Sequence, residues 1–246
     1  MKIVIVGATS AIAEHCCRLW VAEQPTDLTM IVRDTVKAEK IAADLRVRGS
    51  GTTVNVVKGD FLDPAAIEAL VDSIAAAGPV DTVLIAQGWL SDQQTGQSDL
   101  GFLRDSIAIN ALSPILFAEA FAQHFVTVGR GTLGIIGSVA GDRGRKTNYI
   151  YGAAKGFLAR HAEGMQHRFA GSQVKVVLIK PGPTESPMTA EIQAKGRRVA
   201  STEDVARAIV DGMKRGKPVI YAPPIWRAIM LVVRHIPRFI FNKLPI

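Results

Sequence analysis

The phenol and ammonium groups of a Tyr-x-x-x-Lys sequence are the side chains best suited to proton transfer in this chain. Tyr151 and Lys155 stand four residues apart, a spacing that places two side chains on one face of a helix. The pKa of free tyrosine is about 10, and a neighbouring cation lowers it by favouring the phenolate. We therefore predict that Tyr151 is a general acid and base near neutral pH. Tyr149 lacks such a partner, because Ala153 stands four residues after it.

A serine precedes this pair at the end of an apolar run. The run from Gly131 to Gly137 predicts a strand, and Ser138 follows it directly. Ligands of parallel sheets bind beyond the carboxyl ends of the strands. We therefore expect Ser138 to face the same cleft as Tyr151 and to hydrogen-bond a reacting carbonyl oxygen.

The elements that must position these groups alternate between apolar runs and helical patterns, which is typical of repeated β-α units and a parallel sheet. The predicted strands are Lys2–Val6, Leu28–Val32, Thr53–Lys58, Thr82–Ala86, Gly131–Gly137, Lys175–Ile179 and Val219–Tyr221. The predicted helices are Ala11–Ala22, Thr35–Arg48, Pro64–Ala77, Leu100–Val128, Ile150–Phe169 and Thr202–Arg215. The long fourth segment is expected to break or bend near Ser113-Pro114. This pattern predicts an α/β fold, a single Rossmann-type doubly wound sheet flanked by helices.

Length, charge and cysteine content limit the class of protein. The 246 residues are enough for one large domain over residues 1–222, with a basic tail over residues 223–246. The net charge of +7 could attract nucleic acid, an anionic membrane or an acidic substrate; we exclude nucleic acid because no recognition motif accompanies the charge. Cys16 and Cys17 are adjacent and no secretory signal is evident, so we expect a cytoplasmic protein. The five histidines show no ligand pairing, and we expect no metal.

The tail, residues 223–246, mixes large apolar residues with basic ones. Its uninterrupted apolar runs are shorter than the ~18 residues that a membrane-spanning helix needs. Arg227, Arg234 and Arg238 have the spacing of one helical face. Two interpretations stay open: an amphipathic segment in peripheral contact with a membrane, or a segment packed on the domain or on a second subunit.

The first strand leads into a turn suited to a dinucleotide. Gly7 would form a tight turn, and the following helix would offer free amide groups and its positive dipole end to a pyrophosphate. The residues expected to contact the cofactor in this turn are Gly7, Thr9, Ser10 and Ile12. Arg33 follows the second strand, where an NAD site places an acid for the ribose 2′-hydroxyl. An arginine instead suits a 2′-phosphate, with Lys37 one turn later, so we predict NADP(H).

With these motifs in place, the chain resembles the short-chain dehydrogenase/reductase family over about residues 1–222. The resemblance implies that Ser138, Tyr151, Lys155 and Asn110 are catalytic, with Lys155 binding the nicotinamide ribose and Asn110 holding a water. It also implies cofactor contacts at Tyr151, Lys155, Asp60, Phe61, Ala86, Gly88, Pro181, Gly182, Thr184 and Ser186. The family's glycine motif reads Gly7, Ala11 and Ala13 here. Its Asn-Asn-Ala-Gly reads Ile85-Ala86-Gln87-Gly88, which keeps only the glycine. A homodimer or homotetramer is implied as well.

The substrate is expected to be a small carbonyl compound, reduced to a secondary alcohol with NADPH. A basic loop between Ser138 and Tyr151 carries Arg143, Arg145 and Lys146, and a second basic cluster consists of Lys195, Arg197 and Arg198. Two positive segments beside one cleft favour an anionic substrate such as a phosphate ester, while two solvated loops are the alternative.

Together with the tail, this pattern resembles more weakly the membrane-associated reductases of decaprenyl-phosphoryl keto-ribose. A reductase of 3-oxoacyl thioesters or of steroid-like ketones stays open. A non-catalytic NADP-binding regulatory protein or a membrane-surface interaction protein is the alternative outside enzymes, because a fold does not determine function.

Overall fold

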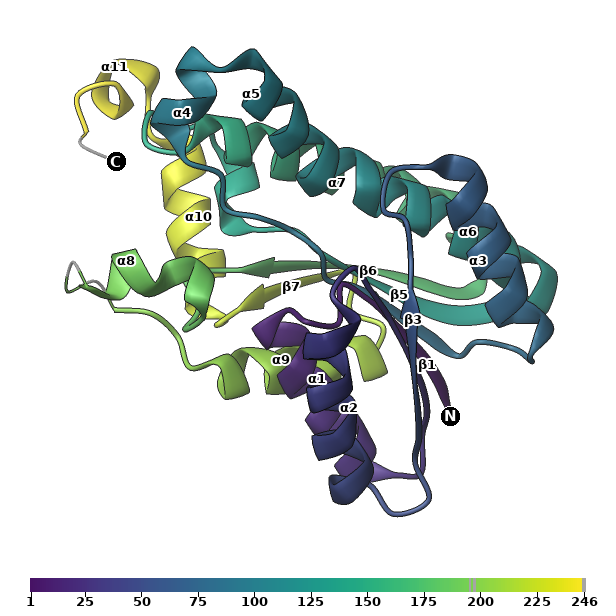
Figure 1. The fold of residues 1–246 in the computed structure, drawn as a ribbon. Coiled ribbons are helices and arrows are strands. Elements are labelled where there is room, and N and C mark those ends of the chain that lie inside the picture. The colour runs from purple at the N-terminus through teal and green to yellow at the C-terminus, as the bar shows by residue number, and fades with distance from the viewer. Residues whose placement is uncertain (195, 197, 245–246) are drawn as a thin grey trace.

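Seven parallel strands form one sheet in the computed structural model, which describes residues 1–194, 196 and 198–244. Their order in the sheet is β3-β2-β1-β4-β5-β6-β7 (Figure 1). The strands are β1 (Lys2–Val6), β2 (Asp27–Val32), β3 (Thr53–Lys58), β4 (Thr82–Ile85), β5 (Arg130–Ile136), β6 (Gln173–Pro181) and β7 (Val219–Ala222). Each predicted strand is present, and the bounds differ by a few residues at the ends.

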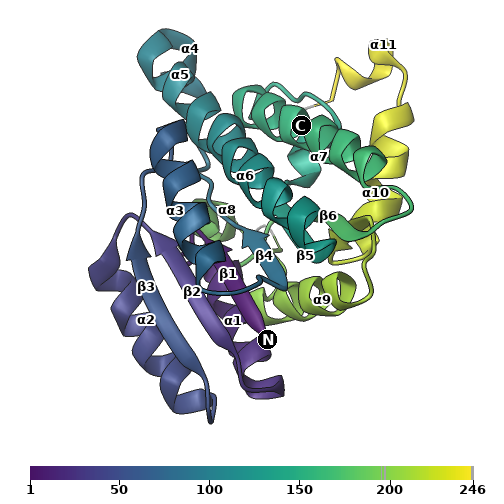
Figure 2. The ribbon, with the colours of Figure 1, turned by 90° about the vertical axis from the view of Figure 1, so that its right-hand side faces the viewer.

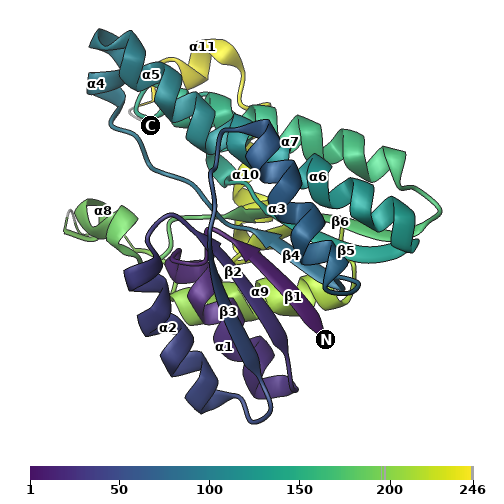
Figure 3. The ribbon, with the colours of Figure 1, turned by 45° about the vertical axis from the view of Figure 1, so that its right-hand side comes forward.

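Helices cover both faces of the sheet, which is why its strands are apolar throughout (Figures 2 and 3). One face carries α1 (Ala11–Glu23), α2 (Thr35–Arg48) and α9 (Thr202–Lys214). The other face carries α3 (Pro64–Ala76), α6 (Ser113–Val128) and α7 (Tyr149–Arg168). The doubly wound Rossmann-type sheet predicted from the sequence is therefore confirmed.

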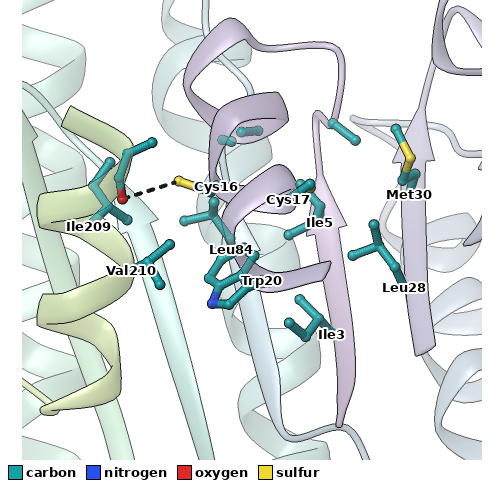
Figure 4. Packing of buried hydrophobic residues seen from close by; sticks show 14 of the residues in the cluster. Ile3, Ile5, Cys16, Cys17, Trp20, Leu28, Met30, Leu84, Ile209 and Val210 are labelled. Carbon is teal, nitrogen blue, oxygen red and sulfur yellow. Dashed lines mark hydrogen bonds between the residues drawn. The ribbon is translucent and has the colours of Figure 1, made fainter. Parts of the chain in front are cut away.

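The core beneath α1 contains both cysteines. Figure 4 shows the side chains of Cys16, Cys17 and Trp20 among apolar residues of β1, β2 and α9. Both thiols are free and fully buried. Burial raises the pKa of Cys17 to about 12 and that of Cys16 well above its ordinary value, so both are uncharged at neutral pH. They serve as small apolar residues.

The long segment 100–128 is divided one turn earlier than predicted. It consists of α5 (Leu100–Ile107), a π-helical turn (Ala108–Leu112) and α6, and the amide of Ser113 donates to the carbonyl of Ala108. Pro114 needs no amide partner in the first turn of α6, so it does not break the helix. Within the described residues, 100–128 is the one helical stretch with the length and hydropathy to cross a membrane. Here Phe117, Phe121 and Phe125 of α6 are fully buried in the core.

Several short helices were not predicted. They are α4 (Gln93–Ser98), α8 (Ala190–Ala194) and α11 (Arg238–Phe241), and Figure 1 shows all three on the same side of the molecule. The tail also contains α10 (Ile225–His235), in the segment whose basic residues had the spacing of a helical face. Helix α10 ends at His235, because Ile236 is extended and Pro237 follows. Arg238 therefore begins a separate helix and does not share a helical face with Arg227 and Arg234, as the sequence spacing had predicted.

Candidate active site

The turn after β1 meets the end of β4 where the strand order reverses, which is the usual ligand crevice of such sheets. Gly7 has a φ of 79°, a left-handed conformation that favours glycine, and a Cβ there would lie 2.6 Å from the amide nitrogen of Gln87. Ala13, which replaces a family glycine, is buried between α1 and the sheet in space that accommodates its methyl group. The variant motif thus keeps the glycine that the backbone requires, and the turn fits a bound dinucleotide.

Cations gather at the other end of this crevice, after β2. The exposed Arg33 lies with its guanidinium carbon 5.9 Å from the ring centroid of Phe61, and the ammonium group of Lys37 donates to the carbonyl of Thr9 at 3.2 Å. The carboxylate of Asp34 instead accepts from the amide of Lys37 and caps α2. One carboxylate oxygen of the acid beside Arg33 thus serves the helix cap, and two cations, Arg33 and Lys37, lie at this end of the crevice.

Asp60 and Phe61, two of the predicted cofactor contacts, lie in the turn after β3. One carboxylate oxygen of Asp60 accepts from the amides of Leu62 and Asp63, and these hydrogen bonds hold its pKa below the ordinary value. Asp60 is exposed and Phe61 is half-buried. The turn after β3 therefore keeps Asp60 ionised, with its second oxygen able to accept a hydrogen bond.

Ser138, Tyr151 and Lys155 come together at the carboxyl end of β5. The ammonium nitrogen of Lys155 lies 5.8 Å from the ring centroid of Tyr151 and donates to the carbonyl of Ile136 at 3.0 Å. The hydroxyl of Ser138 lies beside the phenol, where hydrogen bonding lowers the pKa of Tyr151. The three groups predicted from the sequence thus share one site.

The pKa of Tyr151 moves in the opposite direction to the one predicted. Burial raises it to about 12, and the hydrogen bond of Ser138 opposes that rise only in part. Burial also lowers the pKa of Lys155 to about 8. The cause is desolvation, which penalises the charged form of each group. The phenol is consequently protonated at neutral pH, the form required of a proton donor.

Close backbone contacts fix this arrangement. The 3₁₀ turn Val139–Asp142 packs on α7 so tightly that a Cβ at Gly141 would lie 2.7 Å from the carbonyl carbon of Lys155. A Cβ at Gly152 would lie 2.9 Å from the carbonyl oxygen of Ala140. We call this contact between the 3₁₀ turn and α7, at Gly141 and Gly152, the glycine seam. It was not predicted from the sequence, although a glycine directly after Tyr151 in a helix was a usable signal, since glycine disfavours helices.

Asn110 holds the segment after β4 in place. Its amide group donates to the carbonyls of Trp89 and Ser106 at 2.8 and 3.0 Å, and its oxygen accepts from the amide of Trp89 at 2.8 Å. A Cβ at Gly88 would lie 3.3 Å from the Asn110 oxygen and 3.4 Å from the Lys155 nitrogen. Asn110 lies in the π-helical turn, a feature frequent at functional sites. The side-chain amide of Asn110 thus holds the backbone of Trp89 in position. Its role in holding a water stays a prediction.

The loop predicted to contact the nicotinamide follows β6. Pro181 ends the strand, and the buried Thr184 donates from its hydroxyl to the carbonyl of Gly182 at 2.9 Å. Thr184 also bridges to Ala200 in parallel fashion, which closes the loop. The hydroxyl of Ser186 is engaged with that of Thr189 at 3.3 Å. The loop is thus a folded unit. Ala86, another predicted cofactor contact, directly follows β4 and is buried.

The basic loop divides into residues with different surroundings. Arg143 donates to the carbonyls of Val233 and Ile236, and its guanidinium carbon lies 3.7 Å from the ring centroid of Phe241. It therefore binds the tail instead of facing a substrate, which corrects the prediction made from its position in the loop.

The neighbouring Arg145 is half-buried, and its Nε has no hydrogen-bond partner in the part of the chain that the structure describes. Lys146 is exposed. In the second basic cluster Arg198 is exposed, and Lys195 and Arg197 lie outside the described residues.

A buried ionic cluster next to Ser138 was not predicted. The ammonium group of Lys180 lies 2.6 Å from one carboxylate oxygen of Asp142, and the hydroxyl of Tyr221 donates to the other at 2.8 Å. The side chains of Lys180 and Asp142 are only 7% and 3% exposed. A lysine at the end of the apolar strand β6 was the signal available in the sequence. Among the described residues, no group of three or more His, Cys, Asp or Glu side chains could hold a metal ion.

Comparison with known proteins identifies the family. A family model described as short chain dehydrogenase matches residues 1–197. An uncharacterized oxidoreductase of Streptomyces coelicolor is 31% identical over 99% of this chain and 95% of its own length. A short-chain dehydrogenase from Sphingobium yanoikuyae, solved in complex with NADPH, has the same fold with a TM-score of 0.82, at 23% identity and over 96% of both chains. A 3-oxoacyl-[acyl-carrier protein] reductase from Brucella melitensis, in complex with NAD, has a TM-score of 0.78 at 20% identity over 90% of this chain and 94% of that one. The chain therefore belongs to the short-chain dehydrogenase family of oxidoreductases.

Proposed function

We propose that the chain reduces a carbonyl compound to a secondary alcohol with NADPH, and that Tyr151 donates the proton to the carbonyl oxygen. The observation that carries this proposal is the convergence of Ser138, Tyr151 and Lys155 beside the dinucleotide turn at Gly7. NADPH, when bound, supplies the hydride.

Each side chain of the site has one task in this proposal. Tyr151 holds a proton on its hydroxyl at neutral pH, because burial raises its pKa to about 12. Ser138 donates a hydrogen bond to the carbonyl oxygen and orients it. Lys155 binds the ribose hydroxyls and supplies positive charge as the phenol gives up its proton. Asn110 keeps the segment around Gly88 against Lys155.

The preference for NADP(H) over NAD(H) rests on the surface after β2. Arg33 is exposed there, Lys37 is held over the turn after β1, and the carboxylate of Asp34 is engaged in capping α2. A 2′-phosphate would be met by two cations, and Arg33 stands where an NAD site places the acid that accepts from the ribose hydroxyl.

The test is NADPH oxidation with a panel of ketones, measured for the parent and for Tyr151→Phe. We expect Tyr151→Phe to lower kcat by about a hundredfold or more, while the affinity for NADPH, measured by fluorescence, stays unchanged. The matched control is Tyr149→Phe, since Tyr149 precedes it in the same helix and is exposed. Equal turnover by parent and Tyr151→Phe would refute the mechanism. NADPH binding without turnover of any ketone would instead favour the non-catalytic alternative.

We also propose that the substrate carries an anionic group that contacts Arg145, with Lys146 nearby. Burial lowers the pKa of Arg145, and its Nε lacks a partner within the described residues. An anion would offset the loss of hydration. We expect Arg145→Gln to raise KM for a phosphorylated ketone about tenfold or more and to leave KM for its unphosphorylated analogue unchanged. Arg160→Gln on the exposed side of α7 is the control, and an equal KM in both enzymes would remove the proposal.

A homodimer or homotetramer stays a prediction from the family resemblance. Exposed apolar side chains at Leu112 of the π-helical turn and Phe157 of α7 support it. Light scattering on the purified protein measures the mass directly.

A further inference from the structure

We propose that α10 and α11 form a docking surface for an anionic lipid membrane. This tail surface consists of Ile225, Ile229, Val232, Phe239 and Ile240, with Arg227, Arg238 and Lys243 around them. The inference does not rest on the proposed function, because it concerns where the protein binds and not which reaction it catalyses.

The apolar residues of the tail surface are turned to solvent. Met230 of α10 is buried and Trp226 is half-buried, so one side of the helix packs on the domain. Val232 of α10 is 65% exposed and Phe239 of α11 is 70% exposed. Exposed apolar side chains on two adjacent helices mark an interaction surface, because isolated ones are the rule elsewhere on a protein.

The charge of the tail selects the kind of partner. Residues 223–246 contain four Lys and Arg residues and no Asp or Glu. A second copy docking tail against tail would bring eight like charges together without an acid on either tail. An anionic lipid surface offers apolar interior for the exposed side chains and headgroup charge for the cations, the combination that interfacial helices use.

The tail surface is held rigidly by the domain. Arg143 donates to the carbonyls of Val233 and Ile236 at the end of α10, where free carbonyls and the negative dipole end favour a cation. The ring of Trp226 fills the space above Gly182, where a Cβ would lie 1.9 Å from the indole nitrogen. The domain therefore holds both ends of α10, and its first turn lies against the start of the loop predicted to contact the nicotinamide.

The experiment is co-sedimentation of the full chain with vesicles of phosphatidylcholine, pure or mixed with phosphatidylglycerol. We expect sedimentation with the mixed vesicles that weakens as salt is raised. The double variant Val232→Ser/Phe239→Ser should lower the partition coefficient about tenfold or more, since it removes two inserted apolar groups. Arg227→Gln should lower it severalfold, since about 1 kcal/mol per cation near an anionic surface is a severalfold change.

Matched controls are available on α2, which lies at the opposite edge of the sheet. Val36 and Val47 are 71% and 89% exposed, so Val36→Ser/Val47→Ser removes apolar surface of the same kind, and Lys40→Gln removes one charge. Both controls should sediment like the parent. Unchanged sedimentation of Val232→Ser/Phe239→Ser would overturn the proposal. The proposal would also be overturned if the parent did not sediment with the mixed vesicles and the variant differed from it in mass by light scattering. A second copy of the chain would then cover the surface.

Discussion

The two halves of the cleft are built on different principles. The nucleotide half, formed by the turns after β1, β2 and β3, contacts solvent through side chains such as Arg33 and Asp60 and relies on backbone conformation at Gly7. The catalytic half, formed after β4, β5 and β6, buries the polar side chains behind Ser138 and Tyr151, which are themselves half-buried: Asn110 is fully buried and Lys155 is 1% exposed. Burial strengthens the hydrogen bonds and ion pairs there. Removing one partner is therefore costly, since the buried group that remains keeps its full desolvation penalty.

The largest expected effect concerns the buried pair next to Ser138. We predict that Asp142→Ala lowers the free energy of unfolding by roughly 3–5 kcal/mol, because it leaves the ammonium group of Lys180 buried without a counter-charge. Urea unfolding followed by circular dichroism measures it. Asp211→Ala, which removes an exposed carboxylate 3.7 Å from Arg215, is the control and should cost at most about 1 kcal/mol. Equal losses in the two variants would show that the catalytic half is no more sensitive than the surface.

The second effect is a pH dependence due to Lys155. Its pKa is about 8 in the folded chain, against about 10.4 in an unfolded one. Between these values the folded chain releases the proton first, so the unfolded chain binds more protons and stability rises with pH. Below about pH 8 the lysine is protonated in both states and its burial penalty is fully present.

The measurement is the difference in unfolding free energy between Lys155→Met and the parent, taken from about pH 7 to pH 10. The variant should be the more stable at neutral pH, on the order of 3 kcal/mol, with the difference shrinking as pH rises through the window. Tyr151, whose pKa is raised to about 12, lowers stability only above about pH 10, outside this window. A difference independent of pH would contradict the assigned pKa.

The third effect tests the glycine seam within a single helix. Gly152→Ala places a methyl group 2.9 Å from the carbonyl oxygen of Ala140, which should cost about 1–3 kcal/mol and lower kcat by displacing Ser138 from Tyr151. Gly164→Ala is the control, because nothing lies within 4 Å of its added carbon, and it should stabilise α7 by about 0.5–1 kcal/mol. If both substitutions changed the free energy of unfolding in the same direction, the glycine seam would not be what holds Ser138 and Tyr151 together.

The smallest effect belongs to the nucleotide half. We predict that Arg33→Gln raises KM for NADPH about tenfold, or about 1.4 kcal/mol, and leaves KM for NADH unchanged, because the lost contact is to the 2′-phosphate alone. The control is Lys40→Gln, which removes an exposed charge from α2, the helix that follows Arg33. It should change neither KM value. A fall in affinity for both nucleotides would mean that Arg33 contributes to folding or to a shared part of the cofactor.

Local patterns in the sequence were sufficient for the fold and for the set of side chains that we propose to react. Apolar runs of strand length alternate with helical segments, and this alternation requires a parallel sheet covered on both faces. The four-residue spacing of Tyr151 and Lys155 is a property of one helix, and Ser138 follows the adjacent strand in any such sheet. Each of these inferences depends on residues that are neighbours along the chain.

Tertiary contacts decided what the sequence could not. Arg143 and Arg145 stand two residues apart in one loop, yet Arg143 binds carbonyls at Val233 and Ile236 of the tail while Arg145 does not. The pKa of Tyr151 rises because the folded chain removes water from it, an effect that no spacing reveals. Partners such as Lys180 of β6 and Asp142 of the 3₁₀ turn are far apart in the sequence, and they meet only in the folded state. The sequence by itself therefore determined which side chains could meet at the proposed site, and the packing around them determined their pKa values and their neighbours.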